Sequence, residues 1–245
     1  MKVVILAGGL GTRLSELTKT TPKPMVKVGS YPIITHIMNH YLNYGFEDFI
    51  LATGYKNTHF TSYFKNFKKF GQVFRSRIFN KSCKVTILNT GVKTMTGGRL
   101  KKTYKHLDNN ENFMFTYGDG ISDVNLSKLH KHHLKEKKMI TVTAVRPPAR
   151  FGEIIIKKDI VTSFKEKPQV TNGWINGGFF IAKKNFLKII KNDNEILEKR
   201  PLELVSKKKQ LSAFRHNGFW KCMDVKRDRD ELQKIYLKNK FNWKN

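Results

Sequence analysis

The stretch VVILAGGLGTRL, residues 3–14, decides the fold class of this chain. Residues 3–6 are all apolar, and a short apolar run that ends at glycines is typical of a buried strand in a parallel sheet. Gly8, Gly9 and Gly11 let the backbone approach a ligand closely and turn its N–H groups toward an anion. The loop after the first strand of such a sheet lies at the carboxyl edge, where these folds bind nucleotides, so we expect an anion-binding loop here.

Apolar runs alternate with helical patterns along the first half of the chain. The pattern predicts strands at residues 2–6, 49–53, 85–88, 113–117 and 140–145, and helices at residues 33–44, 59–67, 100–106 and 126–136. In the second half we expect a hairpin at residues 151–156 and 160–164, an apolar run at residues 179–182, and helices at residues 186–190, 202–208 and 229–237. This order predicts a single α/β domain over residues 1–245, with a Rossmann-like, mixed, mostly parallel sheet flanked by helices and an added β-rich region after residue 146.

The composition is that of an ordinary globular protein, with 245 residues, 39% hydrophobic and 27% charged. Cys83 and Cys222 lie far apart without metal-binding spacing, so we interpret them as incidental thiols in a reducing compartment. No apolar run approaches the roughly 18 residues that span a bilayer. Residues 3–7 are also too short for the apolar part of a signal peptide. We therefore expect a cytoplasmic protein with no membrane partner.

The formal net charge of +28 raises nucleic-acid binding as an alternative function. The lysines are scattered over most of the expected helices, and asparagine is also abundant. A general bias toward lysine and asparagine explains the charge without a partner, so we expect no nucleic-acid ligand. A polyanionic substrate would still associate faster with such a surface.

Two cations lie close to the glycine loop in the sequence. Arg13 follows the loop directly, and Lys23 stands between Pro22 and Pro24, whose rings stiffen the backbone around it. We expect both cations to face the same anionic ligand. The loop has neither the GxGxxG pattern of dinucleotide-binding folds nor the GxxxxGK[ST] pattern of P-loop enzymes.

A candidate metal ligand follows the strand expected at residues 113–117. Asp119 lies between two glycines, where its carboxylate can face a ligand, and carboxylate oxygens are ligands that Mg²⁺ prefers. A lone aspartate after a strand is more often a helix N-cap, and we interpret Asp123 in that way because it precedes the helix expected at residues 126–136. His130, His132 and His133 have no cysteine or acidic partner at zinc-binding spacing, so we expect no zinc site there.

Several short motifs resemble those of one enzyme family, in the same order along nearly the whole chain. The stretches LAGGLGTRL (residues 6–14) and PKPMV (22–26) resemble the opening of the sugar-nucleotide pyrophosphorylases, which are nucleotidyltransferases. The resemblance continues through YGDG (117–120), EKP (166–168), NGGF (176–179) and FWKCMD (219–224). Within that family, TMTGGRLK (94–101) resembles the glucose-1-phosphate cytidylyltransferases.

The resemblance implies an enzyme that makes CDP-glucose and pyrophosphate from CTP and glucose 1-phosphate, acts as a homo-oligomer and uses Mg²⁺. Residues 1–146 would form a nucleotide-binding half, and residues 147–245 a sugar-binding and C-terminal half. A member of the family with another base or another phosphorylated acceptor is the alternative. A non-catalytic relative should have lost Arg13, Lys23, Asp119 or Asp224, and all four are present.

The same resemblance implies a role for each site residue. Arg13 and Lys23 would be catalytic, and Asp119 and Asp224 would hold Mg²⁺, with Asp224 joined to Asp119 by the resemblance alone. If both hold one ion, residues near the end of the chain must fold back over the carboxyl edge of the early sheet. The remaining nucleotide-binding residues would be Leu6, Ala7, Gly8, Gly9, Leu10, Gly11, Thr12, Thr94, Gly98 and Arg99, with Asp119. The sugar phosphate would contact Glu166, Lys167, Asn176 and Gly177.

Overall fold

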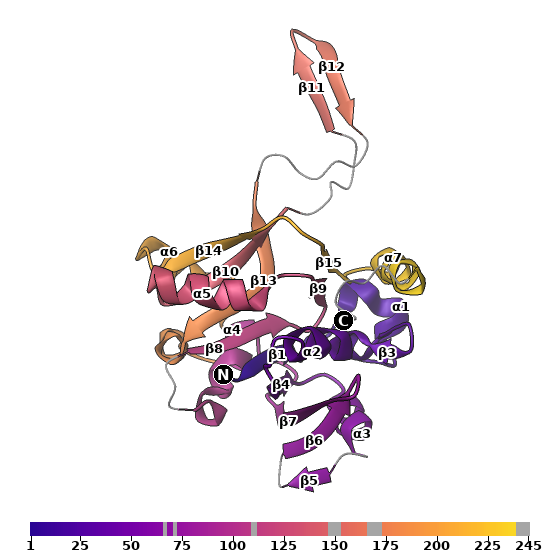
Figure 1. Cartoon of the computed structure of the whole chain (residues 1–245), viewed down its shortest axis with the longest axis vertical. Helices are drawn as coiled ribbons and strands as arrows, with labels where there is room; N and C mark the ends of the chain where they lie inside the picture. Colours follow the sequence, from indigo (N-terminus) through magenta and orange to yellow (C-terminus); the bar gives the residue numbers. More distant parts are fainter. Residues whose placement is uncertain (66–67, 71–72, 109–111, 147–152, 166–172, 239–245) are drawn as a thin grey trace.

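Strand β1 (Val3–Ala7) lies in the middle of the sheet, and all five of its residues are buried. The structure is a computed structural model that describes residues 1–65, 68–70, 73–108, 112–146, 153–165 and 173–238. In these residues the main sheet has nine strands, in the order β14-β10-β13-β8-β1-β4-β7-β6-β5 (Figure 1). Their bounds are β14 Leu211–His216, β10 Ile140–Val145, β13 Ile175–Lys183, β8 Asn112–Tyr117, β4 Asp48–Thr53, β7 Lys81–Asn89, β6 Val73–Ile78 and β5 Lys68–Phe70.

The sheet is mixed and mostly parallel, which confirms the expected fold class. Strands β8, β1, β4 and β7 pair in parallel, and so do β10 and β14. Strand β13 is antiparallel to both β8 and β10, and β6 is antiparallel to β7 and β5. The second half of the chain thus inserts β13 next to β8, within the sheet that the first half builds.

Apolar residues on alternate sides of the strands build two cores. Val3 and Ile5 of β1 belong to the cluster that α2 (Ile33–Leu42), α3 (Thr58–Phe64), α5 (Leu126–Glu136) and α7 (Lys226–Leu237) complete. Val4 and Leu6 belong to the other cluster, with α4 (Thr96–Lys102) and α6 (Arg200–Lys207). Because successive strand residues point to opposite faces, a continuous apolar run is what a sheet covered on both faces requires.

A short pair of strands brings the end of the chain back to the carboxyl edge of the sheet. β9 (Gly120–Ser122) pairs antiparallel with β15 (Trp220–Cys222), so that Cys222 lies opposite Gly120. The Met223 backbone N–H donates to the carbonyl of Asp119 at 2.9 Å. Residues 220–223 therefore fold back over the carboxyl edge of the sheet, as a metal ion shared by Asp119 and Asp224 would require.

The expected hairpin is present as β11 (Glu153–Lys157) and β12 (Ile160–Lys165), and it projects from the body in Figure 1. Lys158 and Asp159 at its turn both have positive φ, 46° and 64°, as a two-residue hairpin turn prefers. The smaller elements are the short helix α1 (Ser15–Thr18), the 3-10 helices η1 (Thr12–Leu14), η2 (Lys23–Met25), η3 (Tyr104–His106) and η4 (Lys184–Ile189), and the paired strands β2 (Lys27–Val28) and β3 (Tyr31–Pro32).

Several sequence-based expectations differ from the structure. The helix expected at residues 186–190 is the 3-10 helix η4. The helix expected at residues 100–106 begins earlier, as α4, and ends at Lys102, with η3 as a separate turn. The N-cap expected at Asp123 is wrong, because Asn125 caps α5 through a 2.8 Å hydrogen bond that its side chain accepts from the Lys128 N–H. Asp123 Oδ1 instead lies 2.9 Å from His216 Nε2.

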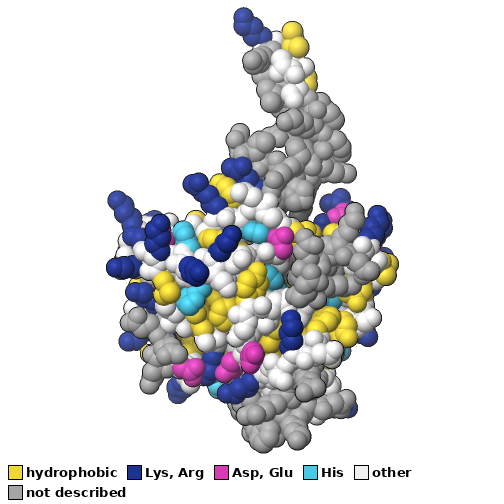
Figure 2. Space-filling view, viewed as in Figure 1, with side chains coloured by type: hydrophobic (Ala, Val, Ile, Leu, Met, Phe, Trp, Pro, Cys, Tyr) yellow, Lys and Arg dark blue, Asp and Glu magenta, His cyan; other side chains and the backbone are white. Residues whose placement is uncertain are grey.

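Lysine and arginine side chains lie at separate places around the body and on the hairpin, on the face that Figure 2 shows. In the part of the chain that the structure describes, no helix has the length and hydrophobicity to cross a bilayer.

Candidate active site

A cavity of about 790 Å³ opens at the carboxyl edge of β1 and β8. Of the residues proposed from the sequence, its lining includes Leu6, Ala7, Gly8, Gly9, Leu10, Gly11, Thr12, Arg13, Lys23, Thr94, Arg99, Asp119, Asn176 and Asp224. The lining also includes Met95, Thr96, Tyr117, Trp220 and Cys222, which belong to the motifs quoted above, and further residues that the sequence did not suggest, such as Val92 and Ile196. Glu166 and Lys167 lie outside the described residues.

Two carboxylates converge on one ammonium group in this cavity. Lys23 Nζ lies 2.6 Å from Asp119 Oδ2 and 2.7 Å from Asp224 Oδ1, and only 12% of the Lys23 side chain is exposed. Arg13 Nη1 lies 2.8 Å from the second oxygen of Asp224, with 71% of the Arg13 side chain exposed. The structure thus brings together all four residues that the resemblance places at the reaction centre.

The position of Lys23 follows from the prolines on either side of it. Pro22 accepts from the Met25 N–H at 2.7 Å, which closes the short 3-10 turn η2. Pro24 packs against Gly118, where a β-carbon would lie 2.9 Å from the Pro24 Cγ. Because Gly118 has no side chain, η2 can approach the end of β8, and Lys23 reaches the carboxylate of Asp119.

The charge of Lys23 is stabilised in its partly buried site. Burial alone would lower the pKa of its ammonium group, but Asp119 and Asp224 outweigh that effect and raise it above the ordinary value. Lys23 is therefore a permanent cation. Cys222, in the same cavity, has its pKa raised to about 11, first by burial and then by the charges of Asp224 and Asp119, so it is a neutral thiol.

Arg99 supports the glycine loop from beneath. Its Nη1 donates to the carbonyls of Thr53 and Gly91 at 3.0 and 2.7 Å and to the Thr90 hydroxyl at 2.7 Å. A β-carbon at Gly8 would lie 2.1 Å from that same nitrogen, so only glycine fits over the guanidinium. Because these acceptors are neutral, they do not cancel the positive charge of Arg99. That charge therefore lies uncompensated by them beside the glycine loop.

The segment that starts α4 packs against residues 193–195. The Met95 N–H donates to the Asp193 carbonyl at 2.8 Å, and the Gly97 N–H donates to the Glu195 carbonyl at 2.9 Å. A β-carbon at Gly98 would lie 2.4 Å from the Asp193 carbonyl oxygen, so Gly98 permits this close approach rather than facing the cavity. Thr94 is buried and donates to the Thr90 carbonyl at 2.6 Å.

The opposite wall of the cavity comes from β13. The Asn176 side chain donates through Nδ2 to the Tyr117 hydroxyl at 3.1 Å and accepts through Oδ1 from the Gly178 N–H at 2.8 Å. The carbonyl of Gly177 accepts from the Trp220 indole N–H at 2.7 Å, which ties β13 to β15. Gly177 is buried, and a β-carbon there would lie 2.7 Å from Val145 Cγ1.

The chain matches a known protein family over most of its length. The model of the nucleotidyl transferase family matches residues 2–225. This chain belongs to the nucleotidyl transferase family. It is an enzyme, and the sugar-nucleotide pyrophosphorylase resemblance seen in its motifs is confirmed.

Curated relatives of this nucleotidyltransferase align over its whole length. The glucose-1-phosphate cytidylyltransferase of Salmonella typhimurium is 42% identical over 254 residues, covering 100% of this chain and 99% of the relative. The probable glucose-1-phosphate cytidylyltransferase of Bacillus subtilis is 35% identical over 255 residues, with the same shares, 100% and 99%, covered. HddC from Yersinia pseudotuberculosis shares the fold, with a TM-score of 0.73 at 24% identity over 96% of this chain and 99% of that one.

Nucleotidyltransferases of this family generally use a divalent metal ion. Asp119 Oδ2 and Asp224 Oδ1 already converge on one cation, the Lys23 ammonium group, so hard oxygen ligands face a common point. Among the described residues, no cluster of three or more His, Cys, Asp or Glu side chains could hold a metal. Two carboxylates with substrate phosphates as further ligands suit Mg²⁺, which rarely has an all-protein cage. Asp119 and Asp224 are therefore suitable ligands for a Mg²⁺ ion.

Proposed function

We propose that this nucleotidyltransferase makes CDP-glucose and pyrophosphate from CTP and glucose 1-phosphate. The observation that carries the proposal is the 42% identity, over the full length of both chains, to a glucose-1-phosphate cytidylyltransferase. The geometry supports it independently, because a cavity of about 790 Å³ joins an anion-binding loop, two cations and two carboxylates.

The reaction is an in-line displacement at phosphorus. A phosphate oxygen of glucose 1-phosphate attacks the α-phosphorus of CTP, and the bond from that phosphorus to the β-phosphate oxygen breaks. Pyrophosphate leaves with the electron pair. A phosphate monoester has its second pKa at about 6 and is largely a dianion at neutral pH, so no general base is required. Catalysis then consists mainly of positioning and charge stabilisation.

The residues of this chain divide those tasks. Arg13 and Lys23 would exchange their carboxylate partners for the phosphates of CTP and stabilise the departing pyrophosphate. The backbone N–H groups of residues 8–12 would add fixed dipoles. Leu6, Ala7, Thr94, Gly98 and Arg99 would shape or contact the nucleotide site. Asn176 and Gly177 on β13 would bind the sugar phosphate, together with Glu166 and Lys167 of the EKP motif.

Asp119 and Asp224 would hold Mg²⁺ once the phosphates have drawn Lys23 away from them. When bound, the ion would neutralise phosphate charge, which lowers the cost of bringing two polyanions together. The family resemblance also implies a homo-oligomer, and we propose this state for the enzyme.

The experiment that tests the function is a matrix of substrates. The purified chain is incubated with each of CTP, UTP, dTTP, ATP and GTP and with a panel of sugar 1-phosphates, and pyrophosphate release is measured. We expect the fastest release from CTP with glucose 1-phosphate. If pyrophosphate is released fastest from another pair of substrates, the family assignment stands and the proposed substrates are wrong. No release from any pair, with salt-sensitive binding to random DNA, would favour the nucleic-acid alternative.

A further inference from the structure

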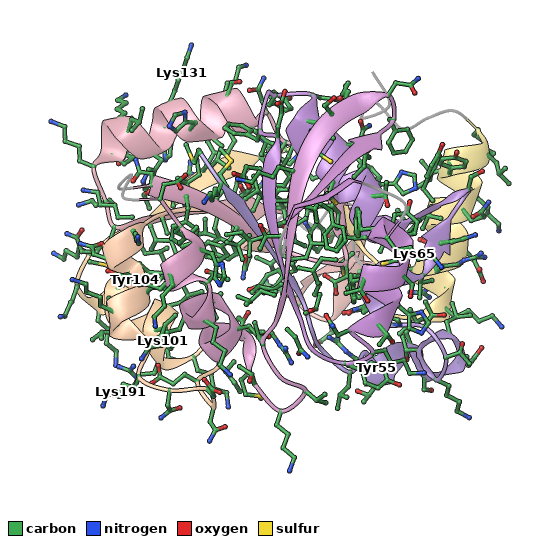
Figure 3. The ribbon with its side chains drawn as sticks, turned by 90° about the horizontal axis from the view of Figure 1, so that it is seen from below. Tyr55, Lys65, Lys101, Tyr104, Lys131 and Lys191 are labelled. Carbon is green, nitrogen blue, oxygen red and sulfur yellow. The ribbon has the colours of Figure 1, made fainter. Side chains whose placement is uncertain are left out.

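The loop before α6 is tied closely to the start of α4. Besides the backbone hydrogen bonds from Met95 and Gly97, Lys101 Nζ donates to the Lys191 carbonyl at 2.7 Å. Figure 3 labels both lysines on the same side of the molecule. Lys102 Nζ also lies 2.5 Å from the Asp193 carboxylate. Residues 191–198 therefore have a defined position relative to the nucleotide wall of the cavity.

Within this loop, the carboxylate of Glu198 binds two residues that line the cavity, Thr96 and Tyr117. Its Oε2 accepts from the Thr96 hydroxyl at 2.8 Å, and its Oε1 accepts from the Tyr117 hydroxyl. Thr96 also accepts from the Leu197 N–H at 2.9 Å, so its hydroxyl has a fixed direction. Hydrogen bonds to an ionised acceptor are about twice as strong as neutral ones, and Glu198 makes two of them.

The Tyr117 hydroxyl connects Glu198 to Asn176 on β13, the opposite wall of the cavity. It accepts from Asn176 Nδ2 at 3.1 Å while it donates to Glu198. Burial, and then the negative charge of Glu198, raise the pKa of Tyr117, so the phenol keeps its proton and remains a donor. Because Asn176 Oδ1 accepts from Gly178, both ends of the Asn176 amide are engaged and its orientation is set.

Thr96, Tyr117 and Asn176 all line the cavity, and Glu198, which is not among the lining residues, hydrogen-bonds to Thr96 and Tyr117 and through Tyr117 to Asn176. Thr96 begins the helix beside the proposed nucleotide-binding residues, and Asn176 is a proposed sugar-phosphate residue. We propose that Glu198 is a positioning residue that couples the nucleotide and sugar sides of the cavity, so that ordering one side by its substrate orders the other. The inference rests on the proposed function for the assignment of the two sides.

The substitution Glu198→Gln tests this coupling with little change in size. In glutamine an NH₂ donor replaces one of the two carboxylate oxygens that now accept from the hydroxyls, so one link must be lost or reversed. Steady-state rates are measured in the full chain with each substrate varied at saturation of the other. We expect the KM for glucose 1-phosphate to rise about tenfold, as the loss of one hydrogen bond to a charged group implies, with kcat falling less. Glu203→Gln, on the exposed face of α6, is the matched control and should leave both KM values unchanged.

Calorimetry of glucose 1-phosphate binding, with and without a non-hydrolysable CTP analogue, measures the coupling itself. In the wild type the analogue should tighten sugar-phosphate binding, and in Glu198→Gln this effect should fall about tenfold. Tyr117→Phe should reproduce the change, and the double variant should be no worse than either single one, because both substitutions interrupt the same chain of hydrogen bonds from Thr96 to Asn176.

These experiments distinguish a failure of the proposed coupling by Glu198 from a failure of the proposed function. If the wild type prefers another substrate pair, the proposed function fails, and the coupling is measured with that pair instead. Unchanged KM values and coupling in Glu198→Gln would overturn the inference. So would a lower Tm with a loss in kcat alone, which indicates a purely structural role, or effects of the two substitutions that multiply.

Discussion

Lys23 and Asp224 lie 201 positions apart in the sequence, yet Lys23 Nζ is 2.7 Å from Asp224 Oδ1. The short pair β9–β15 makes this possible, because it places the end of the chain against the residues that follow β8. Asp224 also accepts from Arg13, so one carboxylate contacts both proposed catalytic cations. In this arrangement the cations and carboxylates neutralise one another, and phosphates must compete for the cations.

Arg13→Ala should lower kcat more than it raises the KM for CTP. The charge of Arg13 matters most as pyrophosphate departs, and removing one such group typically costs about 10²–10³ in rate. Because the side chain is 71% exposed, the Tm should change little. Lys19→Ala, an exposed lysine nearby, is the control. Steady-state kinetics with normal kcat in Arg13→Ala would show that the reaction centre lies elsewhere.

Asp119→Asn and Asp224→Asn should each weaken activity and Mg²⁺-dependent binding of CTP, measured by calorimetry. If both act through one ion, the double variant should be little worse than the poorer single variant. EDTA should abolish activity, and added Mg²⁺ should restore it. A shared ion is ruled out if activity survives EDTA or if the two single losses multiply in the double variant.

Much of this site could be predicted from local sequence. The apolar strand, the glycine loop and the prolines around Lys23 act through their own backbone, so their effect is visible in a short stretch. Strand β14 was missed because its side chains alternate only weakly in burial, and its place depends on pairing with β10. β5 and β6 were missed as well, and they depend on antiparallel pairing that begins from β7.

Contacts between distant segments could not be predicted. The roles of Gly98 and Arg99 in packing depend on residues 193–195 and on the loops after β4 and β7, which no local pattern specifies. Asp123 and Asn125 both precede α5, but Asn125 caps the helix and Asp123 lies beside His216, which comes from a distant segment. Glu198 lies in none of the recognised motifs. Its two hydroxyl partners, Thr96 and Tyr117, come from other parts of the fold.

Gly8→Ala should destabilise the protein, whereas Gly9→Ala should not. A β-carbon at Gly8 would meet Arg99 Nη1 at 2.1 Å, but one at Gly9 would have nothing within 4 Å. Displacing the bound guanidinium is expected to cost about 1–3 kcal/mol of unfolding free energy, as overpacking typically does. Thermal unfolding should therefore show a Tm several degrees lower for Gly8→Ala alone. Equal Tm values for the two variants would contradict the close packing of Arg99 beneath the loop.

The unfolding free energy should fall as the pH drops from about 6.5 to about 4, partly through His40. Burial lowers the pKa of His40 to about 4, despite its hydrogen bond to the Val124 carbonyl at 2.9 Å. Because the unfolded chain binds the proton more readily, stability that is present above pH 6.5 is lost below it, by at most about 3 kcal/mol for this group. His40→Gln should flatten the dependence in urea titrations across this range. An equally steep dependence in the variant would exclude His40 as its source.

Competition among nucleotides tests the cytidylyltransferase assignment most directly. A single reaction contains equal concentrations of CTP, UTP, dTTP, ATP and GTP with Mg²⁺ and glucose 1-phosphate, and the sugar nucleotides formed early are identified by mass. Their ratios give the relative kcat/KM values. A site that pairs with the exocyclic amine of cytosine leaves buried groups unpaired with any other base, so discrimination by several powers of ten is attainable. We predict CDP-glucose as the dominant product, with UDP-glucose the next. Predominant formation of dTDP-glucose or GDP-glucose would contradict the assignment.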